Sequence, residues 1–245
     1  MIKKSFLSRA IYFLRNKRSK ELFRALATYC SGNVLDVGGW DFYLEAKKRK
    51  IKFESWTILE LTKEFKPDIS DKNFKFVVGD GCKMKFKNNS FDTVLNIQVL
   101  EHVFEPLRMI KEISRVLKPG GFGIFLIPQT STLHMLPHHY YNFTRFWIEE
   151  AMKKNDLKII ELKPLGGIWS SLASHLVYFF FQSTRFPGMS PKECKRNLFF
   201  YILYPFMCLY AIINIPISLF FSLGDLAEEP NNYLIVVKKL RKQNE

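Results

Sequence analysis

Carboxylates and glycines stand at the ends of three consecutive apolar runs near the start of the chain. These residues are Asp36, Gly38, Gly39, Glu60, Asp80 and Gly81. Glycine lets the backbone approach a bound nucleotide closely, and an acidic side chain at the end of a second strand accepts hydrogen bonds from ribose hydroxyls. Glu60 follows Asp36 by 24 residues, close to the spacing of that ribose contact. The pattern predicts a nucleotide-like ligand, with Asp36 and Glu60 on solvent-reachable loops at strand ends.

Alternating strands and helices would position these residues. Strands are expected over 34–37, 56–61, 76–78, 91–97, 122–127, 157–162 and 233–237, and helices over 42–50, 107–117 and 148–155. This alternation predicts an α/β fold whose mostly parallel sheet is covered by helices on both faces. The residues Lys118-Pro119-Gly120-Gly121 are expected to close the helix over 107–117.

The order of motifs resembles that of class I S-adenosylmethionine-dependent methyltransferases. Besides the residues above, the series includes Asn89-Ser90-Phe91-Asp92, Val99-Leu100-Glu101-His102-Val103 and Arg115-Val116-Leu117-Lys118-Pro119-Gly120-Gly121. The resemblance covers residues 34–162 and resumes at Tyr233. It implies a Rossmann-like seven-stranded sheet with a reversed last strand, which would be the strand over 233–237.

The resemblance implies S-adenosylmethionine as the cofactor. The residues that match the family's cofactor site are Asp36, Gly38, Gly39, Glu60, Asp80, Gly81 and Asn96. The group after the first strand would hold the methionine end, Glu60 the ribose and the group after the third strand the adenine, while Asn96 would line the floor. The family usually has glycines where this chain has Trp40 and Phe42. A nicotinamide enzyme would carry G-x-G-x-x-G after its first strand, and this chain does not.

His102 is the candidate general base for an acceptor that must lose a proton. The alternative is that Glu101 and His102 only orient the helix that follows the fourth strand. Some relatives that methylate quinone hydroxyls use a Glu-x-x-Glu-His metal cluster. Because Gln98 stands at the first of these positions, no metal is expected.

His138, Tyr140 and Arg145 are candidates for contacts with the methyl acceptor. Their segment resembles the His-Asp-Tyr-x-Arg-Tyr-Thr sequence beside the acceptor site of sugar- and lipid-modifying relatives, with His139 and Asn142 in place of the usual Asp and Arg. A metal site made of the clustered histidines is disfavoured, because no carboxylate or cysteine lies at ligand spacing.

Charge and apolar residues are concentrated in different parts of the chain. The formal charge of +14 favours phosphate-bearing partners, either nucleic acid or anionic lipid. Residues 5–28 suggest a basic amphipathic helix, either packed on the domain edge or lying on an anionic membrane. Residues 166–181 and 198–223 carry no formal charge, and the second run is long enough to cross a bilayer. Pro205, Asn214 and Pro216 are expected to kink or break it.

These features predict three parts. A basic N-terminal helical segment spans 1–30, a methyltransferase domain spans 31–165 and 230–240, and a hydrophobic membrane-associating helical insert spans 166–229. Four widely spaced cysteines without a C-x-x-C pair favour a reducing compartment. Because the strands that flank the insert should be neighbours, both its ends must lie on one side of a membrane. A monotopic or peripheral protein at the cytoplasmic face is therefore expected.

The expected activity is methyl transfer to a membrane-embedded or lipid-linked acceptor, such as a lipid-linked glycan, a glycolipid or a quinone. One alternative is a catalytically silent membrane scaffold that kept the fold, which the residue Trp40 favours. A nucleic-acid methyltransferase is disfavoured, because its amino-directed members carry Asn/Asp-Pro-Pro-aromatic where this chain has Asn96-Ile97-Gln98-Val99. The insert could also be a hydrophobic lid or dimer contact in a soluble protein.

Overall fold

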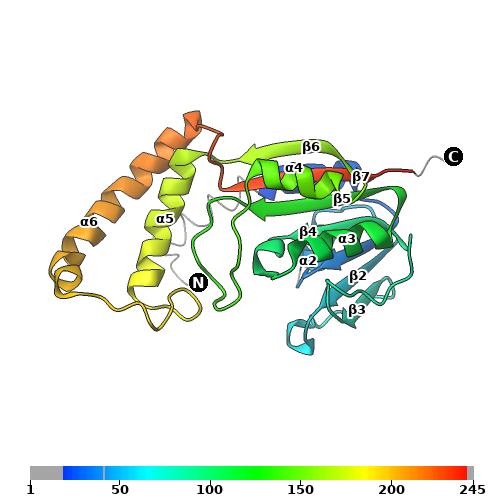
Figure 1. Cartoon of the computed structure of the whole chain (residues 1–245), viewed down its shortest axis with the longest axis horizontal. Coiled ribbons are helices and arrows are strands. Elements are labelled where there is room, and N and C mark those ends of the chain that lie inside the picture. The colour runs from blue at the N-terminus through cyan, green and yellow to red at the C-terminus, as the bar shows by residue number, and fades with distance from the viewer. Residues whose placement is uncertain (1–18, 41, 242–245) are drawn as a thin grey trace. The chain divides into compact units, whose positions relative to one another are not determined.

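The chain folds into two compact units. The computed structural model describes residues 19–40 and 42–241. The sheet unit comprises residues 20–40, 42–128, 141–163 and 233–241 of these, and the hairpin unit comprises 19, 129–140 and 164–232. Figure 1 shows the strands of the first unit and the two long helices of the second. Each unit is described by itself below.

One seven-stranded sheet forms the centre of the sheet unit, in the order β3-β2-β1-β4-β5-β7-β6. The strands are β1 (Asn33–Val37), β2 (Ser55–Glu60), β3 (Phe74–Val78), β4 (Phe91–Ile97), β5 (Leu117–Pro128), β6 (Leu157–Leu165) and β7 (Asn232–Lys239). Strands β1 to β5 pair in parallel, and β7 runs in the reverse direction (Figure 1). The predicted fold is confirmed, including the neighbouring positions of the two strands that flank the insert.

Short helices cover this sheet and bury apolar side chains against it. They are a helical stretch over residues 19–29, α2 (Phe42–Lys48), α3 (Pro106–Val116) and α4 (Arg145–Lys153), together with the single turns η1 (Lys63–Phe65) and η2 (Leu100–His102). On α3 the residues Met109, Ile110 and Ile113 are buried, whereas Arg108 and Lys111 are exposed. This spacing of apolar residues is typical of a helix that packs one face on a sheet.

The expected end of the helix over 107–117 is wrong in one respect. Leu117 already begins β5, so Lys118-Pro119-Gly120-Gly121 belongs to the strand. The pairing shifts register between Phe91↔Leu117 and Thr93↔Phe122. The extra residues form an irregularity in β5, and beside it Lys118 Nζ pairs with Asp92 Oδ1 at 2.8 Å. A Cβ at Gly121 would lie 2.7 Å from the Asp92 carbonyl oxygen, so only glycine allows this close approach.

The N-terminal segment falls mostly outside the described residues. In its described part, residues 19–29, Leu22 and Leu26 are buried, and Phe23 stacks on Phe42 at 5.5 Å between ring centroids. Glu21 accepts a hydrogen bond from Lys163 at 2.6 Å. This part of the segment therefore packs within the sheet unit.

The hairpin unit contains two helices between β6 and β7, namely α5 (Ile168–Ser183) and α6 (Leu198–Phe221), followed by the turn η3 (Ser222–Gly224). Val177 of α5 and Ile215 of α6 are buried in one apolar cluster, and other apolar side chains of the two helices pack around them. The Asp225 carboxylate caps the start of α5 by accepting the N–H of Trp169 at 2.8 Å. The two helices therefore form an antiparallel pair with one small apolar contact surface (Figure 1).

The prolines were expected to kink or break the second apolar run, and the expected break is wrong. Helix α6 continues through both Pro205 and Pro216. Each proline removes one backbone N–H, a local loss that does not prevent helical conformation on either side. Contacts with α5 hold the helix on both sides of Pro205. Before the proline, the hydroxyls of Tyr204 and Ser183 are hydrogen-bonded at 3.0 Å. After it, apolar side chains of α6 pack against α5.

Candidate cofactor site

Asp36 is a buried residue of β1 rather than a residue on a solvent-reachable loop, so that expectation is wrong. Its side chain has no exposure, because β1 is central in the sheet and Gly39 folds back over the carboxyl group. A Cβ at Gly39 would lie 2.1 Å from Asp36 Cγ. Trp56 Nε1 donates a hydrogen bond to Asp36 Oδ2 at 3.2 Å, and Oδ1 has no partner among the described residues. Burial raises the pKa of Asp36 to about 8.

Gly38 and Gly39 turn the chain sharply after β1. Gly38 has a φ of 74°, and its N–H donates to the Leu59 carbonyl at 2.9 Å. A Cβ at Gly38 would lie 2.6 Å from a methyl carbon of Val99. Glycine is required here both by the left-handed backbone and by this contact. The loop thus brings bare backbone to the carboxyl end of β1.

Glu60 ends β2 beside this loop. Its Oε1 accepts the Trp40 N–H at 3.0 Å, and its carboxylate is half-buried. Burial raises the pKa of Glu60, and the hydrogen bonds from the N–H groups of Trp40 and Leu61 oppose that rise. Glu60 is therefore placed by the loop after β1 as well as by its own strand, with a carboxylate able to accept hydroxyl donors.

Trp40 occupies the position where the sequence departs from the expected glycine pattern. Its backbone is left-handed, with a φ of 46°, and its side chain is 59% exposed. Such a conformation costs a non-glycine residue on the order of 1 kcal/mol or more. The indole meets the Phe65 ring edge-on, with 5.4 Å between ring centroids. The spacing of motifs gave no signal for Phe65, which the turn η1 places there.

The ends of β3 and β4 supply the remaining predicted cofactor residues. Asp80 is exposed, and its Oδ1 accepts the Cys82 N–H at 2.7 Å, which closes a tight turn. Asn96 is buried in β4, where its Nδ2 lies 3.4 Å from Met109 Sδ and its Oδ1 has no partner among the described residues. A Cβ at Gly81 would lie 2.5 Å from the same methionine. Met109, which the sequence did not single out, thus packs beneath both strand ends.

All seven predicted cofactor residues therefore lie at the carboxyl ends of four neighbouring strands, β3, β2, β1 and β4. The strand pairings align Val37 with Leu59 and with Asn96, so these ends are level. In an open parallel sheet, this edge is where a ligand binds.

His102 lies close to this edge, on the turn η2 directly after β4. Its side chain is 13% exposed, and its Nε2 lies 3.9 Å from Oε1 of the fully buried Glu101. The Glu101 carbonyl accepts the Tyr141 N–H at 3.4 Å. The arrangement is compatible both with a base and with a residue that orients the start of α3.

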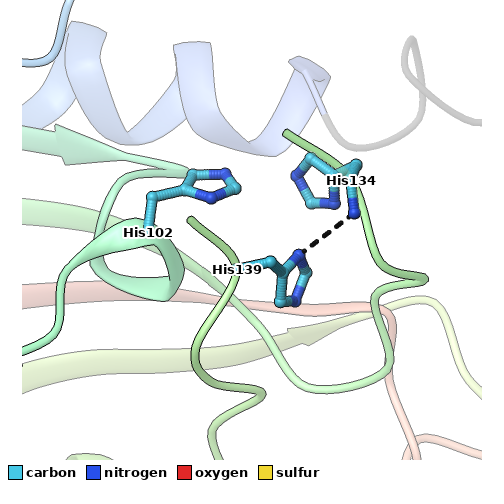
Figure 2. A group of neighbouring side chains, drawn as sticks. All are labelled: His102, His134 and His139. Carbon is cyan, nitrogen blue, oxygen red and sulfur yellow. Dashed lines mark hydrogen bonds between the residues drawn. The ribbon is translucent and has the colours of Figure 1, made fainter. Parts of the chain in front are cut away.

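The predicted acceptor residues are divided between the units. In the hairpin unit, His138 Nδ1 and the Tyr140 hydroxyl lie 3.0 Å apart. His134 donates its backbone N–H to His139 Nδ1 at 3.4 Å, and Figure 2 shows these two side chains together. The same picture draws His102 of the sheet unit. Arg145 also belongs to the sheet unit, where it pairs with Glu149 at 2.8 Å. The roles of these residues and the expected lack of a metal stay predictions.

The buried Asp36 predicts a pH-dependent stability. Because its pKa is about 8 in the folded protein and near 3.8 when unfolded, the neutral carboxyl favours folding at low pH. That contribution is lost progressively as the pH rises from the unfolded pKa of 3.8 to the folded pKa of about 8, at about 1.4 kcal/mol for each unit of pKa difference. Asp36→Asn should therefore gain stability relative to the unaltered chain as the pH rises from about 4 to about 8, with no further gain at higher pH. Urea unfolding at several pH values measures this, and parallel curves would contradict it.

Comparison with known proteins agrees with this geometry. Residues 24–125 match the family described as "Methyltransferase domain". Over 98% of its length the chain superposes on 96% of a chain in the structure described as "Complex between the Haloferax volcanii Trm112 methyltransferase activator and the putative methyltransferase", with a TM-score of 0.61 and 13% sequence identity. The fold is that of a class I S-adenosylmethionine-dependent methyltransferase. A Haemonchus contortus phosphoethanolamine N-methyltransferase solved with S-adenosylmethionine has the same fold, with a TM-score of 0.55 and 16% identity, over 91% of this chain and 53% of that one.

Two curated methyltransferases are similar in sequence over part of their length. A sterol 24-C-methyltransferase of Aspergillus fumigatus is 34% identical over 103 residues, which are 42% of this chain and 24% of that protein. A demethylmenaquinone methyltransferase of Staphylococcus aureus is 37% identical over 115 residues, which are 47% of this chain and 42% of that protein. The chain thus spans less than half the length of these relatives.

The residues of the methyltransferase domain fit S-adenosylmethionine, the cofactor that the family match and the cofactor-bound neighbour support. Asn96 Oδ1 is a buried acceptor without a partner among the described residues, and Glu60 is a half-buried acceptor at the neighbouring strand end. Gly38 and Gly39 add no side chains to the loop after β1, so the ligand can approach the backbone there. Hydroxyl and amine groups of the cofactor supply the donors that these acceptors need.

Proposed function

We propose that this methyltransferase transfers a methyl group from S-adenosylmethionine to a membrane-embedded or lipid-linked acceptor. The observation that carries the proposal is the apolar surface of α6. Within residues 198–224, the most apolar 18-residue stretch has a mean hydropathy of 2.0, and only 22% of that stretch is buried. A helix that is apolar all round belongs in a protein core or in lipid, and α6 is not enclosed by its own unit.

The two similar relatives support a lipid acceptor. One is named for a sterol and the other for demethylmenaquinone, and both names denote apolar molecules. They match 42% and 47% of this chain, respectively. The hairpin unit would supply contact with the phase in which such acceptors dissolve.

The chain order supports a hairpin that enters and leaves one leaflet. Helices α5 and α6 connect β6 with β7, and these strands are neighbours in the sheet, so both ends of the hairpin lie on one side. Helix α5 has 16 residues and is about 24 Å long, shorter than the roughly 30 Å hydrocarbon core. Two upright crossings are therefore disfavoured.

Basic residues at the tip of the hairpin support an anionic lipid surface as partner. The segment between α5 and α6 contains Arg185, Lys192, Lys195 and Arg196 against the single acid Glu193. Charged side chains are costly inside hydrocarbon and favourable beside anionic headgroups. The hairpin would place this segment near the headgroups of the cytoplasmic leaflet, where the cofactor is available.

The chemistry needs little from the protein beyond positioning and one proton acceptor. When bound, S-adenosylmethionine supplies an activated methyl group. Glu60 would accept hydroxyl donors, and the glycine loop would let the backbone lie against the ligand. His102, at the end of β4, would hold the proton of a hydroxyl acceptor.

Replacing His102 with alanine should lower turnover about a hundredfold if the acceptor is a hydroxyl, because a general base is lost. Cofactor affinity should stay unchanged. Turnover within twofold of normal would show that His102 only orients α3.

The proposed function is tested with methyl-labelled cofactor and a membrane extract. Label should enter the material soluble in organic solvent, and it should require the full chain. Label found only in protein, nucleic acid or water-soluble products would refute a lipid or lipid-linked acceptor.

A catalytically silent membrane scaffold is the second candidate, and Trp40 is the observation that favours it. A bulky residue stands in the loop where the family usually has glycine. A scaffold need not bind S-adenosylmethionine, so calorimetric titration separates the two candidates. Micromolar binding together with labelled product supports the enzyme.

A further inference from the structure

We propose that Trp40 and Phe65 form an aromatic wall of the cofactor site and hold the adenosyl part of S-adenosylmethionine. The inference rests on the proposed cofactor and assigns a binding role to Trp40, which replaces a glycine of the family's first motif, and to Phe65, which lies outside the motifs. At position 40 an aromatic ring stands in place of the family's glycine. A stacking contact with the ligand would therefore replace a close approach of the backbone.

The first support is the position of the two rings. Trp40 directly follows the glycine turn after β1, and Phe65 lies on η1, just after β2. Both segments leave the carboxyl edge at which the predicted cofactor residues lie. The ring centroids are 5.4 Å apart, with an interplanar angle of 66°, so the two rings meet in a T-shaped contact, and the Trp40 side chain remains 59% exposed.

The second support is the hydrogen bond between the Trp40 N–H and Glu60 Oε1, 3.0 Å long. Glu60 is the acceptor proposed for the ribose. Glu60 would therefore hold both the backbone N–H of Trp40 and the ribose. The indole is attached to the Cα next to this N–H, so it starts close to the expected ribose contact.

The third support is the poor fit of Trp40 to a structural role. Its backbone is strained at a φ of 46°, and 59% of its side chain remains exposed. Folding gains little from an aromatic ring that stays in water. Strain that packing does not repay is characteristic of ligand-binding loops. Phe65 is also exposed, at 37%, so the pair presents an apolar surface to a ligand.

The adenine of the cofactor can stack on an aromatic ring, because every nucleobase has a π-face. The sulfonium of the cofactor is in addition a cation, which the face of an indole attracts. The same ring could serve S-adenosylhomocysteine through stacking alone. Comparing the two ligands would therefore show how much of the contact depends on charge.

The test is calorimetric titration of full-length variants with S-adenosylmethionine and S-adenosylhomocysteine. Trp40→Gly relieves the left-handed strain and restores the family's usual residue, so it should preserve or raise the melting temperature. We expect it nevertheless to weaken cofactor binding about tenfold, and Phe65→Ala to weaken it several-fold. Trp40→Phe should retain most of the affinity. Phe146→Ala, an exposed aromatic residue of α4, is the matched control and should change nothing.

Fluorescence gives a second readout, because Trp40 is one of four tryptophans. Cofactor should change the emission of the unaltered chain, and most of that change should be absent in Trp40→Phe. Equal or tighter binding by Trp40→Gly would overturn the aromatic wall while leaving the cofactor assignment intact. Failure of the unaltered chain to bind either ligand would instead refute the proposed cofactor function.

Discussion

Glu60→Ala should weaken binding of S-adenosylmethionine by about 10- to 100-fold while the fold persists. The substitution removes a charged acceptor from the end of β2, and hydrogen bonds to charged groups contribute roughly 1.5–3 kcal/mol. It also releases the Trp40 N–H, which now donates to Glu60 Oε1 at 3.0 Å. Calorimetric titration measures the affinity, and circular dichroism checks the fold.

Glu64→Ala is the matched control for this variant. Glu64 is an exposed acid of η1, close in sequence but outside the proposed site. Its loss changes the net charge by the same amount, so a general electrostatic effect would appear in both variants. Equal affinities for Glu60→Ala and the unaltered chain would refute the assignment of Glu60 to the ribose.

Adding two carboxylates to α6, as Phe206→Asp with Ile213→Asp, should move the protein from the membrane fraction to the soluble fraction. Both side chains are exposed, at 67% and 50%, so the change need not disturb the contact with α5. An aspartate in the hydrocarbon costs about 2.5–3.5 kcal/mol, and two of them correspond to a more than thousandfold loss of partitioning. Flotation with phosphatidylglycerol vesicles measures the effect on purified protein.

Leu226→Asp is the control for the membrane variant. Leu226 is exposed at 56% but lies beyond α6 and η3. Cofactor affinity, measured in parallel, separates a lost membrane contact from a lost fold. If the unaltered chain stays in solution without vesicles or detergent, the exposed surface of α6 serves another purpose and the membrane proposal fails.

The fold was predictable because its signals are local. Apolar runs followed by glycine or a carboxylate marked the strand ends, and β4 has the predicted bounds, Phe91–Ile97. The start of β5 was not predictable in this way. Lys118-Pro119-Gly120-Gly121 has the composition of a turn, and only the pairing with β4 and the contact with Asp92 show that the strand begins earlier.

The candidate site was predictable in its residues and less so in their environment. The sequence placed Asp36 at the right strand end, but its burial depends on Gly39 and on Trp56, which comes from the next strand. Side-chain burial of this kind arises from tertiary packing that spacing does not encode. The continuity of α6 through Pro205 and Pro216 likewise depends on contacts with a second helix.

The order of strands has a consequence for biosynthesis. Strand β7 lies between β5 and β6 in the sheet but follows the whole hairpin in the chain. As the chain is made, the sheet therefore stays open along one gap until residues 232–239 are available. The apolar helices emerge before the domain that carries them can close. If the hairpin lies in lipid as proposed above, it becomes available to the membrane before the sheet is complete.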